Sequence, residues 1–317
     1  MKSLNLSVLA GVLATPAVAC DLCSVYSAMQ ARGEVEKGLT LGVAEQFTHY
    51  GTLQEDGAKV PNVLDQRLDS LISQIFVGYN FTDRLGLQVN VPIIHRSFQR
   101  ANDAGEIERG SESGIGDVSL VANFLAYRKA TKQRTFAWTL HGGVKFPTGS
   151  SDRLQEELNE SPPPPGAAES GIHGHDLALG SGSLDGIVGT GLFARRRRLF
   201  VSANAQYTIR TKGDFDYRYA NDLTWWGGPG VFLALNEDYT IALQINVSGE
   251  TKGRDTFQGQ KADDTGITSV FLGPQISLTW TGRLSAELGA DLPVSVDNTA
   301  LQSVPDFRVR AAVNWRF

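Results

Sequence analysis

Apolar and polar side chains alternate without a break over the last stretch of the chain, Phe307 to Phe317. One parity is apolar: Phe307, Val309, Ala311, Val313, Trp315 and Phe317. The other is mostly cationic and polar: Arg308, Arg310, Ala312, Asn314 and Arg316. Consecutive side chains of a β-strand point to opposite faces. This pattern, ending on an aromatic residue, is typical of the closing strand of a bacterial outer-membrane β-barrel, whose apolar face meets lipid.

Similar segments precede this strand along most of the chain. They begin at Leu39, Leu71, Leu85, Gly114, Phe136, Leu177, Leu199, Leu223, Tyr239, Ile267 and Leu284. The predicted fold class is therefore all-β, a transmembrane antiparallel β-barrel of about 12 strands over residues 38–317, and an even strand number is usual for such barrels. A slip of one residue would move Arg308 and Arg310 into hydrocarbon at roughly 2–4 kcal/mol each near the midplane, so the register is strongly determined.

Connections between the predicted strands are alternately long and short. Short turns follow the even-numbered strands, and long polar loops follow the odd-numbered ones. Both termini then lie on one side, which we expect to be the periplasmic side of the cell outer membrane. The expected partners are outer-membrane lipid and the barrel-assembly machinery, the latter through the C-terminal Phe317. A soluble sandwich would need a common core for nearly every apolar face, which does not explain the loop asymmetry.

Two predicted strands depart from clean alternation. Glu45 interrupts the outward apolar parity of the first strand, which we attribute to a bulge or a shift in register. The fourth strand, Gly114 to Arg128, follows a predicted loop over Gln99–Ser113 and also carries Val121 and Leu125 on its inward parity. The apolar face of this strand is therefore less sharply defined than that of the closing strand.

Composition excludes several classes of protein. No run of about 18 apolar residues follows the N-terminus, which excludes an ordinary helical membrane protein. A mean hydropathy of −0.16 agrees with a barrel, because barrel strands only alternate. The formal net charge of −5 gives no reason to expect nucleic acid as a partner.

The N-terminus reads as an export signal. Lys2, an apolar run from Leu4 to Ala14 and small residues up to Ala19 form the basic start, apolar middle and cleavage site of a signal peptide over residues 1–19. Residues 20–37 then form a periplasmic N-terminal segment. Its part from Ser24 onward is rich in Ala, Met, Gln and Glu and is compatible with a short helix at the periplasmic side or inside the pore.

Cys20 and Cys23 are the only cysteines, in a C-x-x-C spacing. A disulfide suits the oxidising compartment of an exported chain. Lipidation of Cys20 is disfavoured, because Ala17 stands where a larger aliphatic residue is usual. Covalent haem requires a histidine after the second cysteine, where Ser24 stands. Metal binding remains an alternative, although two thiolates alone leave a site short of ligands.

Charged side chains on the inward parities are the candidates for a selective lumen. They are Asp117, His141, Lys145, Asp185, Arg210, Glu287, Asp291, Arg308 and Arg310. Glu287 and Asp291 can reach Arg308 and Arg310, because the last two strands are antiparallel neighbours. Such charges either pair with one another in a narrow wet lumen or form a constriction that filters solutes.

The longest connection, Thr148 to Asp176, contains four consecutive prolines and is expected to be a surface loop or lid, with the sixth strand following at Leu177–Ala194. It ends in His173, His175 and Asp176. These residues, alone or with Cys20 and Cys23, are candidate ligands of a metal ion, which is the only cofactor that the sequence raises. A His-x-His pair supplies too few fixed ligands by itself.

Enzymatic activity is not expected. A barrel that hydrolyses bilayer lipids needs its serine and histidine together on the lipid-facing rim. His141 points inward by parity. His95 points outward near the rim, but no serine partner for it is evident from the sequence.

Three glycine-rich segments carry a family resemblance. They are Gly114–Leu120, Val144–Gly149 and Leu179–Asp185, with a long loop between the second and the third. In their order and spacing the chain resembles the transporter-like outer-membrane family named for the MetA pathway of phenol degradation. It departs from that family at Leu184, where the family usually has tryptophan. The resemblance implies a twelve-stranded transport barrel but specifies no solute.

The pattern and the resemblance together predict an outer-membrane channel or transporter that passes small solutes, including aromatic or otherwise hydrophobic compounds, by passive diffusion. No G-x-x-x-x-G-K loop for nucleotide binding is present. The N-terminal segment or the long Thr148–Asp176 loop is expected to plug the pore. The alternatives are a metal-ion-handling barrel that uses Cys20, Cys23, His173 and His175, and a structural barrel that transports nothing.

Overall fold

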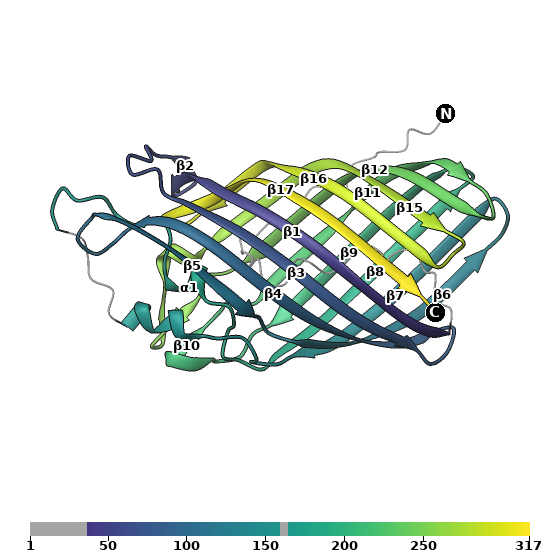
Figure 1. The fold of residues 1–317 in the computed structure, drawn as a ribbon, viewed down its shortest axis with the longest axis horizontal. Coiled ribbons are helices and arrows are strands. Elements are labelled where there is room, and N and C mark those ends of the chain that lie inside the picture. Colours follow the sequence, from purple (N-terminus) through teal and green to yellow (C-terminus); the bar gives the residue numbers. More distant parts are fainter. Residues whose placement is uncertain (1–36, 159–163) are drawn as a thin grey trace, which may run out of the picture.

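A closed barrel of twelve antiparallel strands forms the body of the protein, as predicted (Figure 1). The structure, a computed structural model, describes residues 37–158 and 164–317. Closure occurs between the first strand, β1 (Gly38–Glu55), and the last, β17 (Leu301–Arg316). Their pairing runs from Thr40 opposite Arg316 to Glu55 opposite Leu301. The predicted signal peptide and both cysteines lie outside the described residues.

Each position of the barrel is filled by one strand, except that β5 and β6 lie end to end beside β4. The remaining wall strands are β3 (Arg67–Asn80), β4 (Leu85–Ala101), β5 (Ile107–Ile115), β6 (Ser119–Ala130), β7 (Arg134–Lys145), β8 (Asp185–Arg196), β9 (Leu199–Ile209), β11 (Asp222–Leu235), β12 (Tyr239–Lys252), β15 (Ile267–Trp280) and β16 (Leu284–Asn298). The smaller elements are β2 (Ala58–Lys59), β10 (Tyr217–Arg218), β13 (Thr256–Phe257), β14 (Gln260–Lys261), η3 (Asp152–Leu158), α1 (Gly174–Leu177), η4 (Asp214–Asp216) and η5 (Asp263–Thr265). No helix among the described residues is long and apolar enough to span a membrane.

The outer face of the barrel is apolar along nearly every strand. On β12, for example, the exposed residues Tyr239, Leu243 and Ile245 alternate with inward polar residues such as Gln244 and Asn246. Burial alternates in the same way on most strands, because successive side chains point to opposite faces of the wall.

The irregularity that the sequence predicted at Glu45 of β1 is not found in the structure. The pairing of Glu45 with Ala311 on one side and Ser73 on the other is regular, so Glu45 lies outward without a bulge. Its carboxylate accepts a hydrogen bond of 2.6 Å from the Ser73 hydroxyl, which gives the outward acid a polar partner. The irregularity of β1 lies instead beyond His49, where pairing with β17 shifts register.

The fourth predicted strand is interrupted rather than continuous. β5 ends its pairing with β4 at Ile115 opposite Ile93, and β6 begins its pairing at Ser119 opposite Asn90. Pro92 lies at the break, and a proline has no backbone N–H to continue the ladder. The ladder is interrupted here, although the Gly116 N–H still donates to the Pro92 carbonyl at 2.8 Å, and the next residue, Asp117, is buried with its carboxylate bonded to Lys145.

Boundaries at the long-loop end also differ from the prediction. The segment Gln99–Ser113 is a paired hairpin of β4 and β5, not a loop. The sixth wall strand, β8, begins at Asp185 rather than Leu177, because residues 177–184 lie across the barrel mouth. The short turns and the C-terminal end of the barrel lie together at the opposite end, where the Phe317 N–H donates to the Leu39 carbonyl at 2.9 Å (Figure 1).

The outward parity generates a prediction about depth. Leu243 lies near the middle of the apolar span of β12, whereas Leu85, which is exposed and pairs with the outward Phe124, begins β4 beside a short turn. Leu243→Arg is expected to lower the free energy of unfolding in lipid vesicles by about 2–4 kcal/mol, and Leu85→Arg by about 0–1 kcal/mol. Denaturant titration measures both values. Equal costs at the two positions would contradict a lipid-facing belt.

Candidate functional site: a bore crossed by one loop

The described parts of the connection between β7 and β8, residues 146–158 and 164–184, fold into the mouth of the barrel instead of lying over it. Their apolar side chains are buried there: Leu154, Ile172, Leu177 and Leu179 are each 5% exposed or less. Leu179 packs among inward residues of the wall: Ala44, Ile72, Phe76, Ile94 and Ala312. The connection is therefore packed as part of the barrel interior.

This loop reaches the wall opposite its own strands. The strand order places β17 and β1 on the far side of the barrel from β7 and β8. There the Ser303 N–H of β17 donates to the Gly171 carbonyl at 2.7 Å. The Gln66 amide near β3 donates to the Glu169 carbonyl at 2.8 Å and accepts from the Gly171 N–H at 3.1 Å. The loop thus crosses the whole bore.

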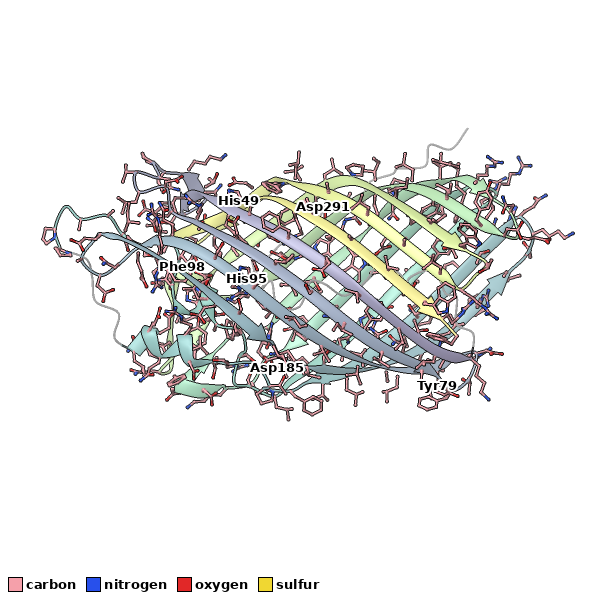
Figure 2. The ribbon with its side chains drawn as sticks, viewed as in Figure 1. His49, Tyr79, His95, Phe98, Asp185 and Asp291 are labelled. Carbon is pink, nitrogen blue, oxygen red and sulfur yellow. The ribbon has the colours of Figure 1, made fainter. Side chains whose placement is uncertain are left out.

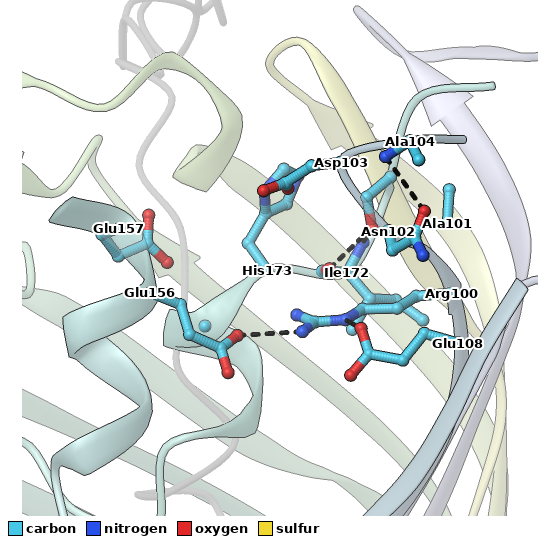
Figure 3. Close-up of a pocket in the computed structure, with 12 residues that line it drawn as sticks. Arg100, Ala101, Asn102, Asp103, Ala104, Glu108, Glu156, Glu157, Ile172 and His173 are labelled. Carbon is cyan, nitrogen blue, oxygen red and sulfur yellow. Dashed lines mark hydrogen bonds and ion pairs between the residues drawn. The ribbon is translucent and has the colours of Figure 1, made fainter. Parts of the chain in front are cut away.

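Two cavities lie on either side of this crossing. An outer cavity of about 460 Å³ is lined by Arg100, Glu108, Glu156, Ile172 and His173 among others, with Arg100 bonded to both glutamates (Figure 3). A smaller cavity of about 80 Å³ lies deeper. It is lined in part by Arg96, Ile172, His175, Glu250 and Lys252. Ile172 borders both cavities, so residues 172–176 form the partition between them.

Arg96 of β4 holds the partition in place from the wall. Arg96 is 3% exposed, and its guanidinium donates to the carbonyls of Asp176 and Ala178, the latter at 3.0 Å. The Tyr219 hydroxyl, on the connection between β10 and β11, donates to the His175 carbonyl at 3.0 Å. Side-chain donors from β4 and from this connection therefore bind the backbone of α1 and its C-cap.

The two histidines of the partition are paired with carboxylates. The rings of His173 and His175 stack at 5.6 Å with an angle of 3°. His175 Nδ1 lies 3.0 Å from Glu157 Oε1, and its Nε2 lies 3.5 Å from Asp176 Oδ1. Burial alone would lower the pKa of His175, but Asp176, Glu157 and Asp264 outweigh it and hold that pKa well above 6.5. A protonated His175 is an ion-pair partner, because both of its nitrogens then donate.

The metal hypothesis gains no support from this geometry. Within residues 37–158 and 164–317, no group of three or more His, Cys, Asp or Glu is arranged to hold a metal ion. His173 Nδ1 lies 3.6 Å from Asp264, and Asp176 also accepts the His173 backbone N–H at 2.9 Å. Cys20 and Cys23, the other proposed ligands, lie outside the described residues.

Four of the predicted lumen residues meet in one buried charge cluster beside the loop. Lys145 pairs with Asp117 and, at 2.9 Å, with Asp185. Arg210 pairs with the same Asp185 at 3.0 Å and with Asp222 at 2.7 Å. All five residues are 6% exposed or less. Positive and negative groups alternate along the cluster, which offsets the cost of removing each charge from water.

The three segments that carry the family resemblance converge on this cluster. Asp117 from the first segment accepts the backbone N–H groups of Gly149 at 3.1 Å and Ser181 at 2.9 Å, which belong to the second and third. Gly149 and Gly180 touch so closely that a Cβ on Gly180 would come within 2.4 Å of the Gly149 carbonyl oxygen. Glycine is therefore required where the two segments cross.

The other predicted lumen residues lie on different walls. Arg310 binds Asp291 at 2.7 Å, as the antiparallel neighbours allow. Arg308 binds Glu250 of β12 at 3.4 Å and lies 4.3 Å above the Phe271 ring.

Glu287 and His141 complete the predicted set. Glu287 accepts a hydrogen bond of 3.3 Å from Gln275 of β15. His141 of β7 lies opposite Gly189 of β8, where a Cβ would come within 2.0 Å of its Nε2.

Two features of the interior escaped the sequence analysis. Aromatic residues of the inward parity gather at the short-turn end, where Phe200 lies 5.7 Å from Phe193 and 4.9 Å from Phe232. The sequence pattern did not reveal these inward aromatic residues, because the outward residues of the same strands are also apolar. A second ion pair, Lys252 with Asp255 at 2.7 Å, lies in a long-loop region that strand parity cannot place.

His95 has a serine partner that the sequence did not reveal. Ser113 lies directly across β4 and β5 from His95, and its Oγ is 2.5 Å from His95 Nδ1 on the exposed outer face. The predicted loop over Gln99–Ser113 concealed this pairing. Among the described residues, no carboxylate forms an ion pair with His95.

The buried cluster predicts a large cost for removing one cation. Lys145→Met leaves Asp117, Asp185 and Asp222 with a single buried counter-ion and should destabilise the barrel by about 3–5 kcal/mol. The matched control is Lys212→Met, which removes an exposed ion pair with Asp216 and should cost at most about 1 kcal/mol. Denaturant unfolding in vesicles measures both. If both variants lost a similarly small free energy of unfolding, the cluster around Lys145 would be accessible to water rather than buried.

The raised pKa of His175 predicts weaker loop docking at alkaline pH. A group whose pKa is higher folded than unfolded stabilises fully below its unfolded value, here 6.5, and the stabilisation is lost as pH rises through the folded pKa. Hydrogen exchange of residues 171–180 should therefore accelerate over that range beyond its intrinsic pH dependence. His175→Gln should abolish the excess, while His49→Gln, on the outer face beside Asp69, should not. If His175→Gln kept the same additional acceleration of hydrogen exchange, deprotonation of His175 would not be its cause.

No known sequence family matches the chain, and no curated protein matches it. Among solved structures, the barrel is similar to the COG4313 outer membrane channel from Pseudomonas putida F1. The two share a TM-score of 0.62 and 18% sequence identity, over 89% of this chain and 96% of the other.

Two other solved structures are less similar to this barrel. The translocator domain of the autotransporter NalP from Neisseria meningitidis has a TM-score of 0.42 and 13% identity, over 91% and 93% of the two chains. A Pseudomonas aeruginosa FadL homologue has a TM-score of 0.35 and 11% identity, over 90% and 91%. The first similarity and the closed sheet together give the chain the fold of an outer-membrane β-barrel.

Proposed function

We propose that this protein is an outer-membrane channel that passes small solutes by passive diffusion, with the short turns and both termini on the periplasmic side. The observation that carries the proposal is the partition at residues 172–176, with one cavity on each side and Ile172 bordering both. A loop that crosses a bore and leaves space above and below it is suited to restrict passage. The structurally similar Pseudomonas putida protein is named an outer membrane channel, which agrees with this role.

The interior favours solutes with both a polar and an apolar part. Water-filled porins have a polar lumen. Here the charge clusters around Lys145 and Arg308 share the interior with the aromatic group Phe193, Phe200 and Phe232 near the short-turn end. An aromatic carboxylate or a similar amphipathic molecule would find partners of both kinds. This chemistry agrees with the family resemblance without assigning phenol itself.

The proposed selectivity rests on the inward charges. The cationic side chains are Lys145, Arg210, Arg308 and Arg310, and the anionic ones are Asp117, Asp185, Glu287 and Asp291, with His141 on the same face. Because the pairs around Lys145 and Arg210 are fully buried, we assign them to holding the loop. Arg310 keeps some exposure at 21% of its side chain and is the better candidate for contact with a passing solute.

The partition can be tested through Arg96. Arg96→Met removes the guanidinium hydrogen bonds to the carbonyls of Asp176 and Ala178, so the loop should open more often and ion conductance in planar bilayers should rise several-fold. Arg109→Met is the matched control, since Arg109 is exposed on β5 and donates to the nearby Gln99 side chain rather than to the loop. Circular dichroism checks that both variants keep the barrel.

Flux in liposomes completes the test. Wild-type protein should pass benzoate faster than gluconate, a monoanion of similar size without an aromatic ring. Absence of conductance and of flux for both solutes, in wild type and in Arg96→Met, would refute the channel. Equal flux of the two anions would leave a channel but contradict the amphipathic solute class.

A further inference from the structure

A dense group of cations lies at the short-turn end of the barrel, on two adjacent hairpins. The turns between β6 and β7 and between β8 and β9 carry Arg128, Lys129, Lys132, Arg134, Arg195, Arg196, Arg197 and Arg198. No acidic residue occurs anywhere in Ser119–Lys145 or Gly186–Gly213. The other three short turns are different: Asp83, Glu237 and Asp238 accompany only Arg84 and Arg283. The positive charge is therefore local, in a chain whose net charge is −5.

Within the part of the chain that the structure describes, these cations have no anionic partners. Among the described residues, none of the eight forms an ion pair with a carboxylate, whereas most cations at the long-loop end do. Seven of the eight are exposed. Arg195 is the partly buried one and binds the Thr135 hydroxyl at 3.1 Å and the Arg197 carbonyl at 2.9 Å. These acceptors are neutral, so they hold the Arg195 side chain in place without neutralising its positive charge.

Three of the cations face the lipid side of the wall. Lys129, Arg134 and Arg196 share the outward parity with Phe136, which is 41% exposed. We call these three residues the cationic shelf. Arg134 lies directly opposite Arg196 in the antiparallel pair of β7 and β8. Like charges in directly opposite positions destabilise a sheet, so an anion between them would relieve the repulsion.

A cavity and an apolar border complete the site. A hollow of about 680 Å³ is lined by the whole shelf together with Lys132, Phe136 and neighbouring turn residues. Leu199, which lies opposite Arg196 on β9, is 66% exposed. Trp138 and Tyr127, on the next row toward the membrane centre, are exposed as well. The shelf therefore lies at headgroup depth, just beyond the aromatic belt that borders the hydrocarbon.

We propose that the cationic shelf binds the phosphodiester headgroup of an anionic glycerophospholipid, such as phosphatidylglycerol, in the leaflet at the short-turn end. The phosphate lies between Arg134 and Arg196 with Lys129 beside it, since paired guanidinium groups match phosphate oxygens. The acyl chains lie along Phe136 and Leu199. Basic residues at a membrane surface attract anionic lipid in this way. The site depends neither on channel activity nor on the direction of the barrel in the membrane.

Native mass spectrometry of protein released from micelles that contain equal phosphatidylglycerol and phosphatidylcholine tests the site. Wild type should retain a phosphatidylglycerol molecule in clear preference to phosphatidylcholine. The variant Lys129→Gln/Arg134→Gln/Arg196→Gln should lose that preference by roughly tenfold or more, because each cation near a charged surface contributes about fivefold. Circular dichroism checks that the variant barrel is folded.

The matched control removes the same charge from the other end of the barrel. Lys59→Gln/Arg218→Gln/Lys261→Gln changes three exposed cations of the long-loop end and should keep the lipid preference. Equal preference in wild type and shelf variant, or equal loss in both variants, would overturn the proposal. Displacement of the lipid by equimolar soluble glycerophosphoglycerol would overturn it too, because it would show that the apolar border contributes nothing.

Discussion

The pairing of β1 with β17 is the constraint on which the rest of the structure depends. In hydrocarbon, an unpaired backbone N–H or C=O has no water to bind, so a sheet can span the membrane only when it has no free edge. The alternation of side chains follows from this closure, since a closed wall has one face for lipid and one for an enclosed interior. The loop between β7 and β8 can reach β17 only because closure brings that strand to the opposite side of the mouth.

Parity made most of the wall predictable from sequence, because strands with lipid on one face must repeat every second residue. It failed where one residue changed the local geometry. Pro92 breaks the pairing of β4 and divides its neighbour into β5 and β6, which a strand pattern read one segment at a time does not reveal. Glu45 looked irregular only because its partner Ser73, 28 residues away, was unknown.

The site was less predictable than the wall. Parity correctly placed Asp291 beside Arg310, since both lie on adjacent regular strands. It could not show that Asp117 and Lys145 would meet Ser181, because the last lies on a loop without periodicity. The partners of His173 and His175 come from η3 and η5, and nothing in the sequence indicates that these segments meet inside a barrel. Loops that cross a bore are placed by tertiary contacts alone.

The contact between Gly149 and Gly180 has a consequence for how finely the mouth is adjusted. Backbone lies against backbone there, with no side chain to yield. A single added methyl group on either glycine would hold residues 177–184 away from the backbone at Gly149, against which they now pack. The position of this loop is thus fixed by backbone atoms alone, and a substitution at either glycine would displace residues 177–184 before it altered any charge of the cluster.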